Sequence, residues 1–361
     1  MPRKTLIPIL TVFLLTAPSI AEELGDGTDI QITRSWSQQP DGWTYPMAIR
    51  VPVGEPPERG YPVCIVLHGN GGNGQGMVGS FADLLPCHAV VAPSGYESSW
   101  NICGERSDAP DLDMIRELVE RLQSFENVDE TRIRIVGISN GSALANNVLI
   151  TNTNPGLDAV CAVVSQLSEA QHRGNAFHAA SGETDPGEDD CGYDQVVSPI
   201  TGRRYLSICN ENDGLIPYEG GESPVGLTFL DAREATFIIA RLMGHEGDRL
   251  EGPGESLGGN VHAYDYLDGR VVHLRGFAGH GMNKVQRAFI PTFLGDCTEP
   301  PDCPEDLDED GSIDGTDLSL LLGHWGDPIE PPGTGFDLDG DGIVAGGDLT
   351  RILGFWGACS G

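Results

Sequence analysis

A serine in the middle of the chain has the surroundings of a nucleophile. Ser139 is the third residue of Gly137-Ile138-Ser139-Asn140-Gly141, a G-x-S-x-G pattern. A β-branched apolar run ends at Gly137 and a helical stretch begins after Gly141, so the glycines allow a sharp turn from strand to helix. Such a turn exposes the Ser139 hydroxyl and places the Asn140 backbone N–H beside it as an oxyanion donor. The pattern predicts acyl-transfer chemistry, and a bystander serine in a tight turn is the simpler alternative.

A serine hydroxyl is a weak nucleophile without a base, and the base needs an orienting carboxylate. In this topology the acid and then the histidine follow the serine along the chain. We assign the acid to Asp213, with Glu211 as its competitor, and the base to His280. Asp213 and His280 both follow strand-like runs, and parallel sheets build their sites at C-terminal strand ends. His262 and His273 lie within strand-like sequence and are expected to be structural.

A glycine-rich loop, HGNGGNGQG, begins at His68 directly after an apolar run at 63–67. Loops of this kind commonly supply the second oxyanion N–H, which we assign to Asn70 or Gly71. His68 is expected to hold the loop in place. A phosphate-binding loop fits less well because the G-K-[ST] ending is missing.

Short apolar runs alternate with helical patterns along most of the chain. The expected strands are 63–67, 89–92, 133–137, 159–164, 205–208 and 271–274. Apolar residues at helical spacing predict helices over 115–122, 232–243 and 283–293. This alternation predicts an α/β fold in which helices cover both faces of a mainly parallel sheet.

These segments together resemble the esterase family that groups polyhydroxybutyrate depolymerases with feruloyl and acetyl-xylan esterases on an α/β-hydrolase fold. The resemblance runs from about 43 to 294 and rests on LHGNGG, VVAPSGYESSWN, APDLDMI, VGISNGSA, NDGLIPYEGG and AGHG. It implies that Ser139 is the nucleophile, Asp213 the acid and His280 the base. Two departures concern the acyl pocket. GHGMNK replaces the aromatic-proline pair that often follows the histidine, and DLD at 111–113 replaces an Asp-Asp pair.

The C-terminal region carries an acidic internal duplication. DLDEDGSIDGTDLSLLLGHWG begins at Asp306, and DLDGDGIVAGGDLTRILGFWG begins 31 residues later, with 12 of 21 positions identical. The spacing of the carboxylates, with Gly at position 6, follows the calcium loop of EF-hands. The predicted Ca2+ ligands are Asp306, Asp308, Asp310, Ser312, Asp314 and Asp317 in the first loop, and Asp337, Asp339, Asp341, Ile343 and Asp348 in the second. Ser312 and Ile343 stand at position 7, where a backbone carbonyl binds.

The second loop has Ala345 at position 9 and therefore lacks one side-chain ligand. Each loop precedes four apolar residues at helical spacing, which we expect to be buried where two helices pack together. These residues are Leu318, Leu321, Leu322 and Trp325, and then Leu349, Ile352, Leu353 and Trp356. A duplicated loop–helix unit resembles a type I dockerin over 303–361. Dockerins are calcium-dependent modules that bind cohesins, which implies a cohesin-type protein partner; a purely structural calcium-stabilised domain is the alternative.

Composition limits the class of partner. The formal net charge of −33 excludes nucleic acid, which requires clustered Lys and Arg. At the N-terminus, two basic residues precede an apolar run at 6–17 and a small-residue site at 19–21, which predicts a secretory signal peptide. We therefore expect a secreted, extracellular protein with no membrane span after cleavage. Nine cysteines in an exported chain permit disulfides and leave at least one thiol free. Cys64 is expected to be buried, and Cys303 could pair with Cys359.

The sequence thus divides into a signal peptide at 1–21, an esterase unit at 22–296, a linker at 297–304 and a calcium-loop unit at 305–361. The expected function is a secreted serine esterase that hydrolyses feruloyl or acetyl esters linked to polysaccharide and needs no catalytic cofactor. A polyester depolymerase is the alternative with the same chemistry. An inactive binding scaffold and a peptidase relative are alternatives from other classes.

Overall fold

The computed structural model describes residues 22–180, 189–295, 303–308, 312–329 and 335–358. The predicted signal peptide lies outside the described residues. Within them, no helix combines the length and the apolar character needed to cross a membrane.

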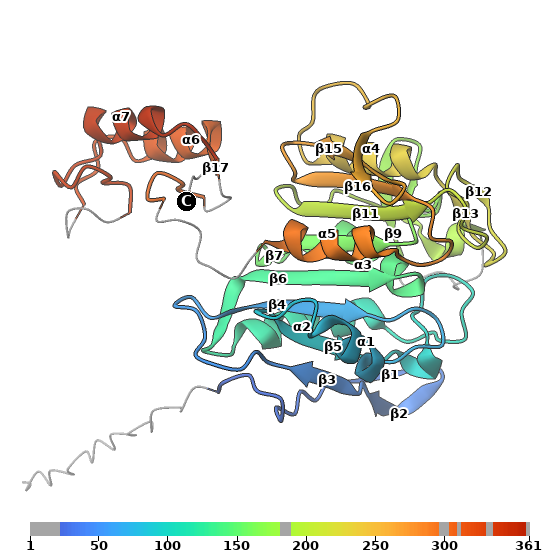
Figure 1. Ribbon diagram of the computed structural model, residues 1–361. Coiled ribbons are helices and arrows are strands. Elements are labelled where there is room, and N and C mark those ends of the chain that lie inside the picture. The colour runs from blue at the N-terminus through green and yellow to red at the C-terminus, as the bar shows by residue number, and fades with distance from the viewer. Residues whose placement is uncertain (1–21, 181–188, 296–302, 309–311, 330–334, 359–361) are drawn as a thin grey trace, which may run out of the picture.

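A nine-stranded sheet forms the centre of the larger unit (Figure 1), in the order β14-β15-β16-β11-β7-β6-β4-β5-β3. Six strands in the middle are parallel, and three at the edges are antiparallel. The parallel strands are β4 (Tyr61–Leu67), β5 (Ala89–Pro93), β6 (Val128–Ile138), β7 (Leu157–Val163), β11 (Arg204–Asn210) and β16 (Val271–Gly276). The others are β3 (Met47–Arg50), β14 (Glu255–Gly258) and β15 (Val261–Tyr266). The six predicted strands are confirmed as the six parallel ones.

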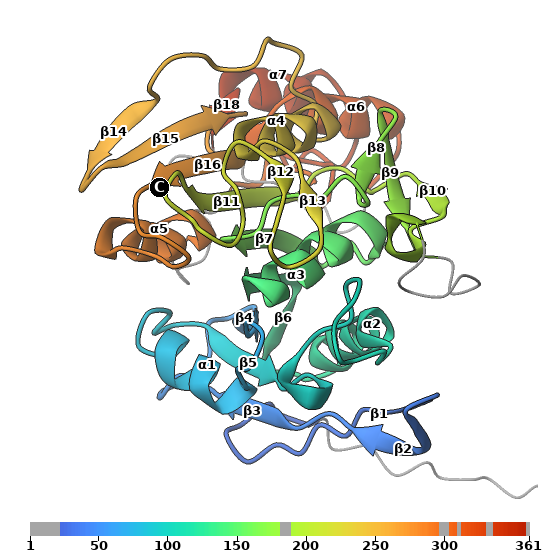
Figure 2. The same ribbon diagram turned by 90° about the vertical axis from the view of Figure 1, so that its right-hand side faces the viewer.

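Helices cover both faces of this sheet, which confirms the predicted α/β class (Figure 2). On one face lie α2 (Asp111–Gln123), α3 (Asn140–Thr151) and α4 (Ala232–Leu242), and on the other α1 (Gly74–Phe81) and α5 (Lys284–Leu294). Every residue of β4 is buried because its side chains alternate between the two faces. Ile65 packs into the first layer and Val66 into the second.

Smaller elements surround the C-terminal ends of the parallel strands. The hairpin β1 (Thr33–Trp36) and β2 (Gln39–Thr44) precedes the sheet, and η1 (Tyr96–Ser98) follows β5. After β7, an insertion forms β8 (His172–Arg173), β9 (Ala176–Ala179), η2 (Asp189–Gly192) and β10 (Gln195–Val197). A second short hairpin, β12 (Gly221–Glu222) and β13 (Thr228–Phe229), follows β11.

Cysteines occur in both oxidation states. A disulfide joins Cys103 to Cys191 and so ties the loop after β5 to the insertion. Cys303 is disulfide-bonded, and its predicted partner Cys359 lies outside the described residues. The prediction of free thiols is confirmed, because Cys64, like Cys161 and Cys209, is buried and unbonded.

The C-terminal unit contains α6 (Gly315–Gly323), α7 (Gly346–Gly354) and the short pair β17 (Ser312–Ile313) and β18 (Gly357–Ala358). Its buried hydrophobic residues are Ile313, Leu321, Val344 and Ile352. They form two pairs related by the 31-residue repeat, Ile313 with Val344 and Leu321 with Ile352. The two copies therefore build one core together.

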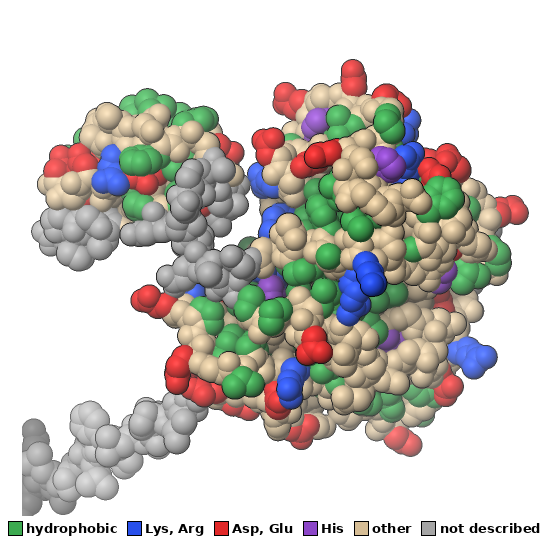
Figure 3. Space-filling view, viewed as in Figure 1, with side chains coloured by type: hydrophobic (Ala, Val, Ile, Leu, Met, Phe, Trp, Pro, Cys, Tyr) green, Lys and Arg blue, Asp and Glu red, His purple; other side chains and the backbone are tan. Residues whose placement is uncertain are grey.

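The predicted burial of the full apolar stripes is wrong. Leu322 and Leu353 are 50% and 55% exposed, and Trp325 and Trp356 are 49% and 50% exposed. Both helices end at glycines before the tryptophans, and two helices in contact bury only a narrow seam of each. Hydrophobic side chains consequently remain on the surface of the C-terminal unit (Figure 3).

Candidate active site

Ser139 sits at the sharp turn between β6 and α3, with φ 55° and ψ −118°. A non-glycine residue rarely adopts a positive φ, and such strain clusters at active sites. The turn requires both flanking glycines. A Cβ on Gly137 would lie 2.1 Å from the Gly141 carbonyl oxygen, and one on Gly141 would lie 2.5 Å from the Leu67 carbonyl oxygen. The sequence G-x-S-x-G therefore produces the tight turn that holds Ser139.

The structure brings Ser139, His280 and Asp213 into one hydrogen-bonded chain. His280 Nε2 lies 2.7 Å from Ser139 Oγ, and His280 Nδ1 lies 2.8 Å from Asp213 Oδ2. The other carboxylate oxygen of Asp213 accepts the N–H groups of Leu215 and Ile216. Because the carboxylate accepts the Nδ1 proton, Nε2 is left to take the proton of the Ser139 hydroxyl. This is the arrangement that activates a serine nucleophile.

The competing acid and the other histidines lie elsewhere. Glu211 forms an ion pair with Arg275 at 3.2 Å. His273 is 1% exposed in β16, where Tyr218 and Ser207 contact its ring nitrogens. Burial lowers the pKa of His273 to about 3, so its ring stays neutral at ordinary pH.

Two asparagines that sequence reasoning missed hold the loop of His280. The buried Asn210 side chain, at the end of β11, donates to the Gly279 and Gly281 carbonyls and accepts the Ala278 N–H. Asn212 accepts the Gly279 N–H. The loops of the acid and the histidine are thus bonded to each other. The run NENDG after an apolar strand was the only signal for these contacts.

The candidate oxyanion donors belong to two segments, one that begins α3 and one that follows β4. Asn140 is the first residue of α3, so its N–H has no acceptor within the helix. The Gly69 backbone lies against Ser139, since a Cβ on Gly69 would be 3.3 Å from the Ser139 Cβ. The Gly71 N–H donates to the Ser98 carbonyl at 2.8 Å, whereas the Asn70 N–H meets no acceptor among the described residues. Asn70 is therefore the candidate second donor.

His68 is fully buried and fixes this loop. Its Nε2 accepts the Gly95 N–H at 2.9 Å, and its Nδ1 lies 2.8 Å from the Gly69 carbonyl. Burial lowers the pKa of His68, which keeps the ring neutral. The ring also packs on that of Trp100, at 4.7 Å between centroids. Neutral and bonded at both nitrogens, His68 holds the loop and does not face the nucleophile.

With Ser139 after β6, Asp213 after β11 and His280 after β16, the larger unit has an α/β-hydrolase-like fold. These three positions are the C-terminal ends of parallel strands, as Figure 1 shows for β6, β11 and β16.

The predicted calcium ligands form two groups of carboxylates in the C-terminal unit. In the first loop, ligand atoms of Asp306, Asp308 and Asp317 lie within 4.8 Å of one another, and in the second those of Asp337, Asp339 and Asp341 do. Hard carboxylate oxygens at this spacing fit a calcium ion. Asp310 lies outside the described residues.

The remaining predicted ligands lie around these groups. Asp314 caps α6 by accepting the Thr316 N–H, and Ser312 belongs to β17. Asp348 accepts N–H groups at both ends of the second loop, those of Leu338 and Ala345. Ile343 is 43% exposed, and because its side chain has no ligand atom, only its backbone carbonyl is available to the loop.

No family model matches the chain, and no curated protein matches it in sequence. Among solved structures, an acetyl xylan esterase from Aspergillus awamori is similar, with 13% identity and a TM-score of 0.48 over 69% of this chain and 93% of that chain. A Bacillus cereus carboxylesterase shows 12% identity and a TM-score of 0.44 over 69% of this chain and 93% of that chain. A poly(3-hydroxybutyrate) depolymerase from Bordetella parapertussis shows 18% identity and a TM-score of 0.38 over 55% of this chain and 72% of that chain. Similarities this distant assign no activity, so the functional argument rests on the site itself.

Proposed function

We propose that the protein is a serine carboxylic-ester hydrolase that acts on acyl groups linked to polysaccharide. The observation that carries the proposal is the continuous hydrogen bonding from Asp213 through His280 to Ser139 at a strained strand–helix turn. The N–H groups of Asn140 and Asn70 supply the oxyanion site that this chemistry requires.

In the proposed reaction, Ser139 Oγ attacks the ester carbonyl carbon while its proton passes to His280 Nε2. The carbonyl oxygen becomes an oxyanion facing the N–H groups of Asn140 and Asn70. As the C–O bond breaks, His280 returns the proton to the departing alcohol and an acyl group remains on Ser139. Water then loses a proton to His280 and attacks the acyl carbon. The bond between this carbon and Ser139 Oγ breaks, His280 returns the proton to Ser139 Oγ, and the acid is released.

The direct test is Ser139→Ala measured on a panel of 4-nitrophenyl esters. Loss of one triad member should lower kcat by at least about 10⁴-fold, with the fold unchanged by circular dichroism. Turnover near that of the wild-type protein would refute the assignment of the nucleophile.

The substrate class is tested by comparing ferulate esters, acetylated xylan, hydroxybutyrate oligomers and peptide anilides. We expect the highest kcat/KM on the polysaccharide-linked esters. A C-terminal module that binds a partner protein would hold the enzyme near an insoluble substrate such as a polysaccharide. Preference for hydroxybutyrate oligomers would favour a polyester depolymerase, and preference for anilides a peptidase. Inactivity on all four would favour a binding scaffold.

We further propose that residues 305–361 bind two structural calcium ions and a cohesin-type protein. The repeat of carboxylate spacing and the shared core of the two copies support this proposal. Binding of a recombinant type I cohesin should need calcium and should be lost on chelation. If no cohesin binds while calcium still raises the thermal stability, the unit is structural only.

Export is proposed from the N-terminal basic and apolar pattern. Expression of the full chain in a secreting host should release protein that begins near residue 22, as read by N-terminal sequencing. Retention of the complete N-terminus in the cytoplasm would contradict it.

A further inference from the structure

The side chain of Asn140 is held on every side by the loop that follows η1. Its Oδ1 accepts the Trp100 N–H at 2.7 Å, and its Nδ2 donates to the Trp100 carbonyl and to Glu105 Oε1, both at 3.1 Å. A carboxamide has two N–H donors and one oxygen acceptor, so all of these groups are engaged. The orientation of Asn140, and hence of its backbone N–H, is set by this loop.

Glu105 in turn organises the loop around its own carboxylate. Oε2 accepts the backbone N–H groups of Ile102 at 3.0 Å and Cys103 at 2.6 Å, while Oε1 faces Asn140. Hydrogen bonds to an ionised carboxylate are roughly twice as strong as neutral ones. Glu105 therefore couples the backbone at Cys103 directly to the Asn140 side chain.

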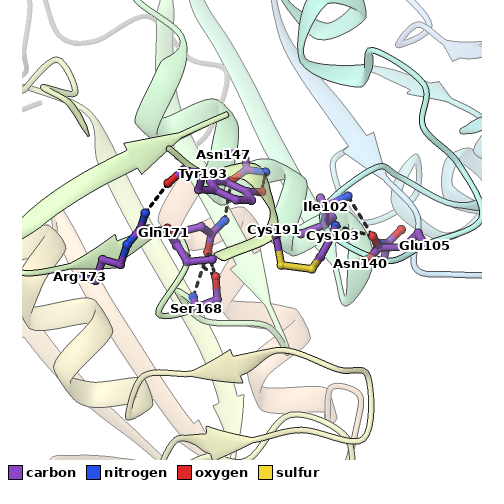
Figure 4. Close-up of a disulfide and its surroundings, with 11 residues drawn as sticks. Ile102, Cys103, Glu105, Asn140, Asn147, Ser168, Gln171, Arg173, Cys191 and Tyr193 are labelled. Carbon is purple, nitrogen blue, oxygen red and sulfur yellow. Dashed lines mark hydrogen bonds between the residues drawn. A yellow bond between two sulfur atoms is a disulfide. The ribbon is translucent and has the colours of Figure 1, made fainter. Parts of the chain in front are cut away.

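The disulfide closes this set of contacts into a ring (Figure 4). Cys103 is bonded to Cys191 in the insertion after β7. Two residues later, the buried Tyr193 hydroxyl accepts a hydrogen bond from Asn147 at 2.5 Å. Asn147 lies on α3, the same helix that begins with Asn140. The chain of contacts thus leaves the N-terminus of α3 and returns two turns further along it.

Trp100 links this ring to the other half of the oxyanion site. It is fully buried, its indole N–H donates to the His68 carbonyl at 2.8 Å, and its ring packs on the His68 imidazole. His68 immediately precedes Gly69 and Asn70. One loop therefore contacts both segments that carry the candidate oxyanion donors.

We propose that residues 100–105, fastened by the Cys103–Cys191 disulfide, position the two oxyanion N–H groups, and that Glu105 is the main positioning residue. This inference rests on the proposed esterase function. A displacement of about 1 Å in a reacting geometry can cost about 100-fold in rate, so a rigid loop at this place has a large effect on catalysis.

The first experiment compares Glu105→Ala and Glu105→Gln on 4-nitrophenyl acetate. We expect kcat/KM to fall by about 10- to 100-fold in the alanine variant. The glutamine variant should lose less, because its single amide oxygen can still accept the two backbone N–H groups. Glu120→Ala, on the exposed side of α2, is the matched control and should retain the wild-type rate.

A transition-state readout separates positioning from general stability. Ser139 Oγ adds to the carbonyl carbon of an aryl trifluoromethyl ketone, and the carbonyl oxygen becomes an oxyanion. The affinity of this inhibitor therefore reports how well the oxyanion site is formed. We expect Glu105→Ala to weaken this inhibitor by the same factor as it lowers kcat/KM. In an Asn140→Ala background, Glu105→Ala should cause a smaller further loss than in the wild-type protein, because only its contacts with Ile102 and Cys103 remain to be lost.

The double variant Cys103→Ser with Cys191→Ser tests whether the disulfide holds the loop at 100–105 in place. It should lower kcat/KM and inhibitor affinity together at a temperature well below its melting point. An unchanged rate in this variant would limit the positioning role to Glu105 and Trp100 and overturn the part assigned to the disulfide.

The whole inference is overturned if Glu105→Ala folds and matches the wild-type protein within about twofold in both kcat/KM and inhibitor affinity. If Ser139→Ala remains active, the proposed function fails first. If Ser139→Ala is inactive and the Glu105 variants are fully active, only the positioning inference fails.

Discussion

Asp111 is the first residue of α2 and is 2% exposed. Its carboxylate accepts the Tyr45 hydroxyl at 2.9 Å and the Asn101 N–H at 2.7 Å, next to the loop that positions Asn140. Burial raises the pKa of Asp111 to about 7. The first aspartate of the DLD motif thus joins the loop at 100–105 to the start of α2 and to Tyr45.

The raised pKa of Asp111 predicts a pH-dependent stability. Between pH 4 and pH 7 the folded state holds a proton that the unfolded state releases, so this residue's contribution to stability falls as pH rises through that range. Asp111→Asn keeps a donor and an acceptor without the charge. As the pH rises from 4 to 7.5, we expect the free energy of unfolding of the variant to increase by up to about 4 kcal/mol relative to that of the wild-type protein.

Urea unfolding of both proteins at the two pH values measures this difference and cancels the titration of other groups. A gap between the two proteins that is the same at both pH values would contradict the buried-carboxylate explanation.

At the scale of elements, the turn from β6 to α3 depends on close backbone approach. Gly141 lies against the carbonyls at the end of β4, and Gly137 lies against Gly141. Gly79, an exposed glycine in α1, has different surroundings, because a Cβ added to it would meet nothing within 4 Å. Composition alone does not distinguish these positions, since only the neighbouring strand makes Gly141 irreplaceable.

We therefore predict that replacing glycine with alanine has opposite effects on stability at Gly141 and at Gly79. Gly141→Ala should destabilise the protein by about 1–3 kcal/mol or more and lower kcat, because the clash moves the strand–helix turn. Gly79→Ala should stabilise it by about 0.5–1 kcal/mol, because alanine favours a helix interior. Thermal unfolding with activity assays measures both, and a Gly141→Ala protein with normal kcat would contradict the turn geometry.

At the scale of the whole molecule, the proposed catalytic residues and the acidic loops belong to separate parts of the chain. Ser139, Asp213 and His280 lie on the unit that ends with α5, and the carboxylate groups follow residue 303. The acidic loops keep like charges close together, which is unfavourable without a cation.

Calcium removal should therefore affect one unit alone. Chelation is expected to lower the helicity and thermal stability of the C-terminal unit and leave kcat/KM on 4-nitrophenyl acetate unchanged. The first loop should bind calcium more tightly than the second, and Ala345→Asp should narrow that gap by restoring a ligand at position 9. Calorimetric titration with circular dichroism measures these effects, and a protein indifferent to chelation would refute the calcium sites.

The middle of the sheet was predictable because fully buried parallel strands are continuous apolar runs. The edge strands β3 and β14 were not predicted, since their exposed or partly exposed residues lack such runs. Sequence around His262 was strand-like, but β15 was not among the six expected strands because polar residues interrupt it. The stripes on α6 and α7 were overestimated because spacing shows which residues share a helix face but not where the helix ends. Trp325 and Trp356 fall beyond those ends.

The sequence by itself determined the order of the chemical groups, since a serine between glycines, an aspartate and a histidine follow three separate apolar runs in that order. It also determined the repeat at the C-terminus. Only the tertiary structure decided which contacts hold the site. Glu105 meets Asn140 and Cys103 is bonded to Cys191 across long stretches of sequence, because β5, β6 and β7 end at the same edge of the sheet. Long-range hydrogen bonds of this kind leave no local pattern, because either partner alone resembles an ordinary polar loop residue.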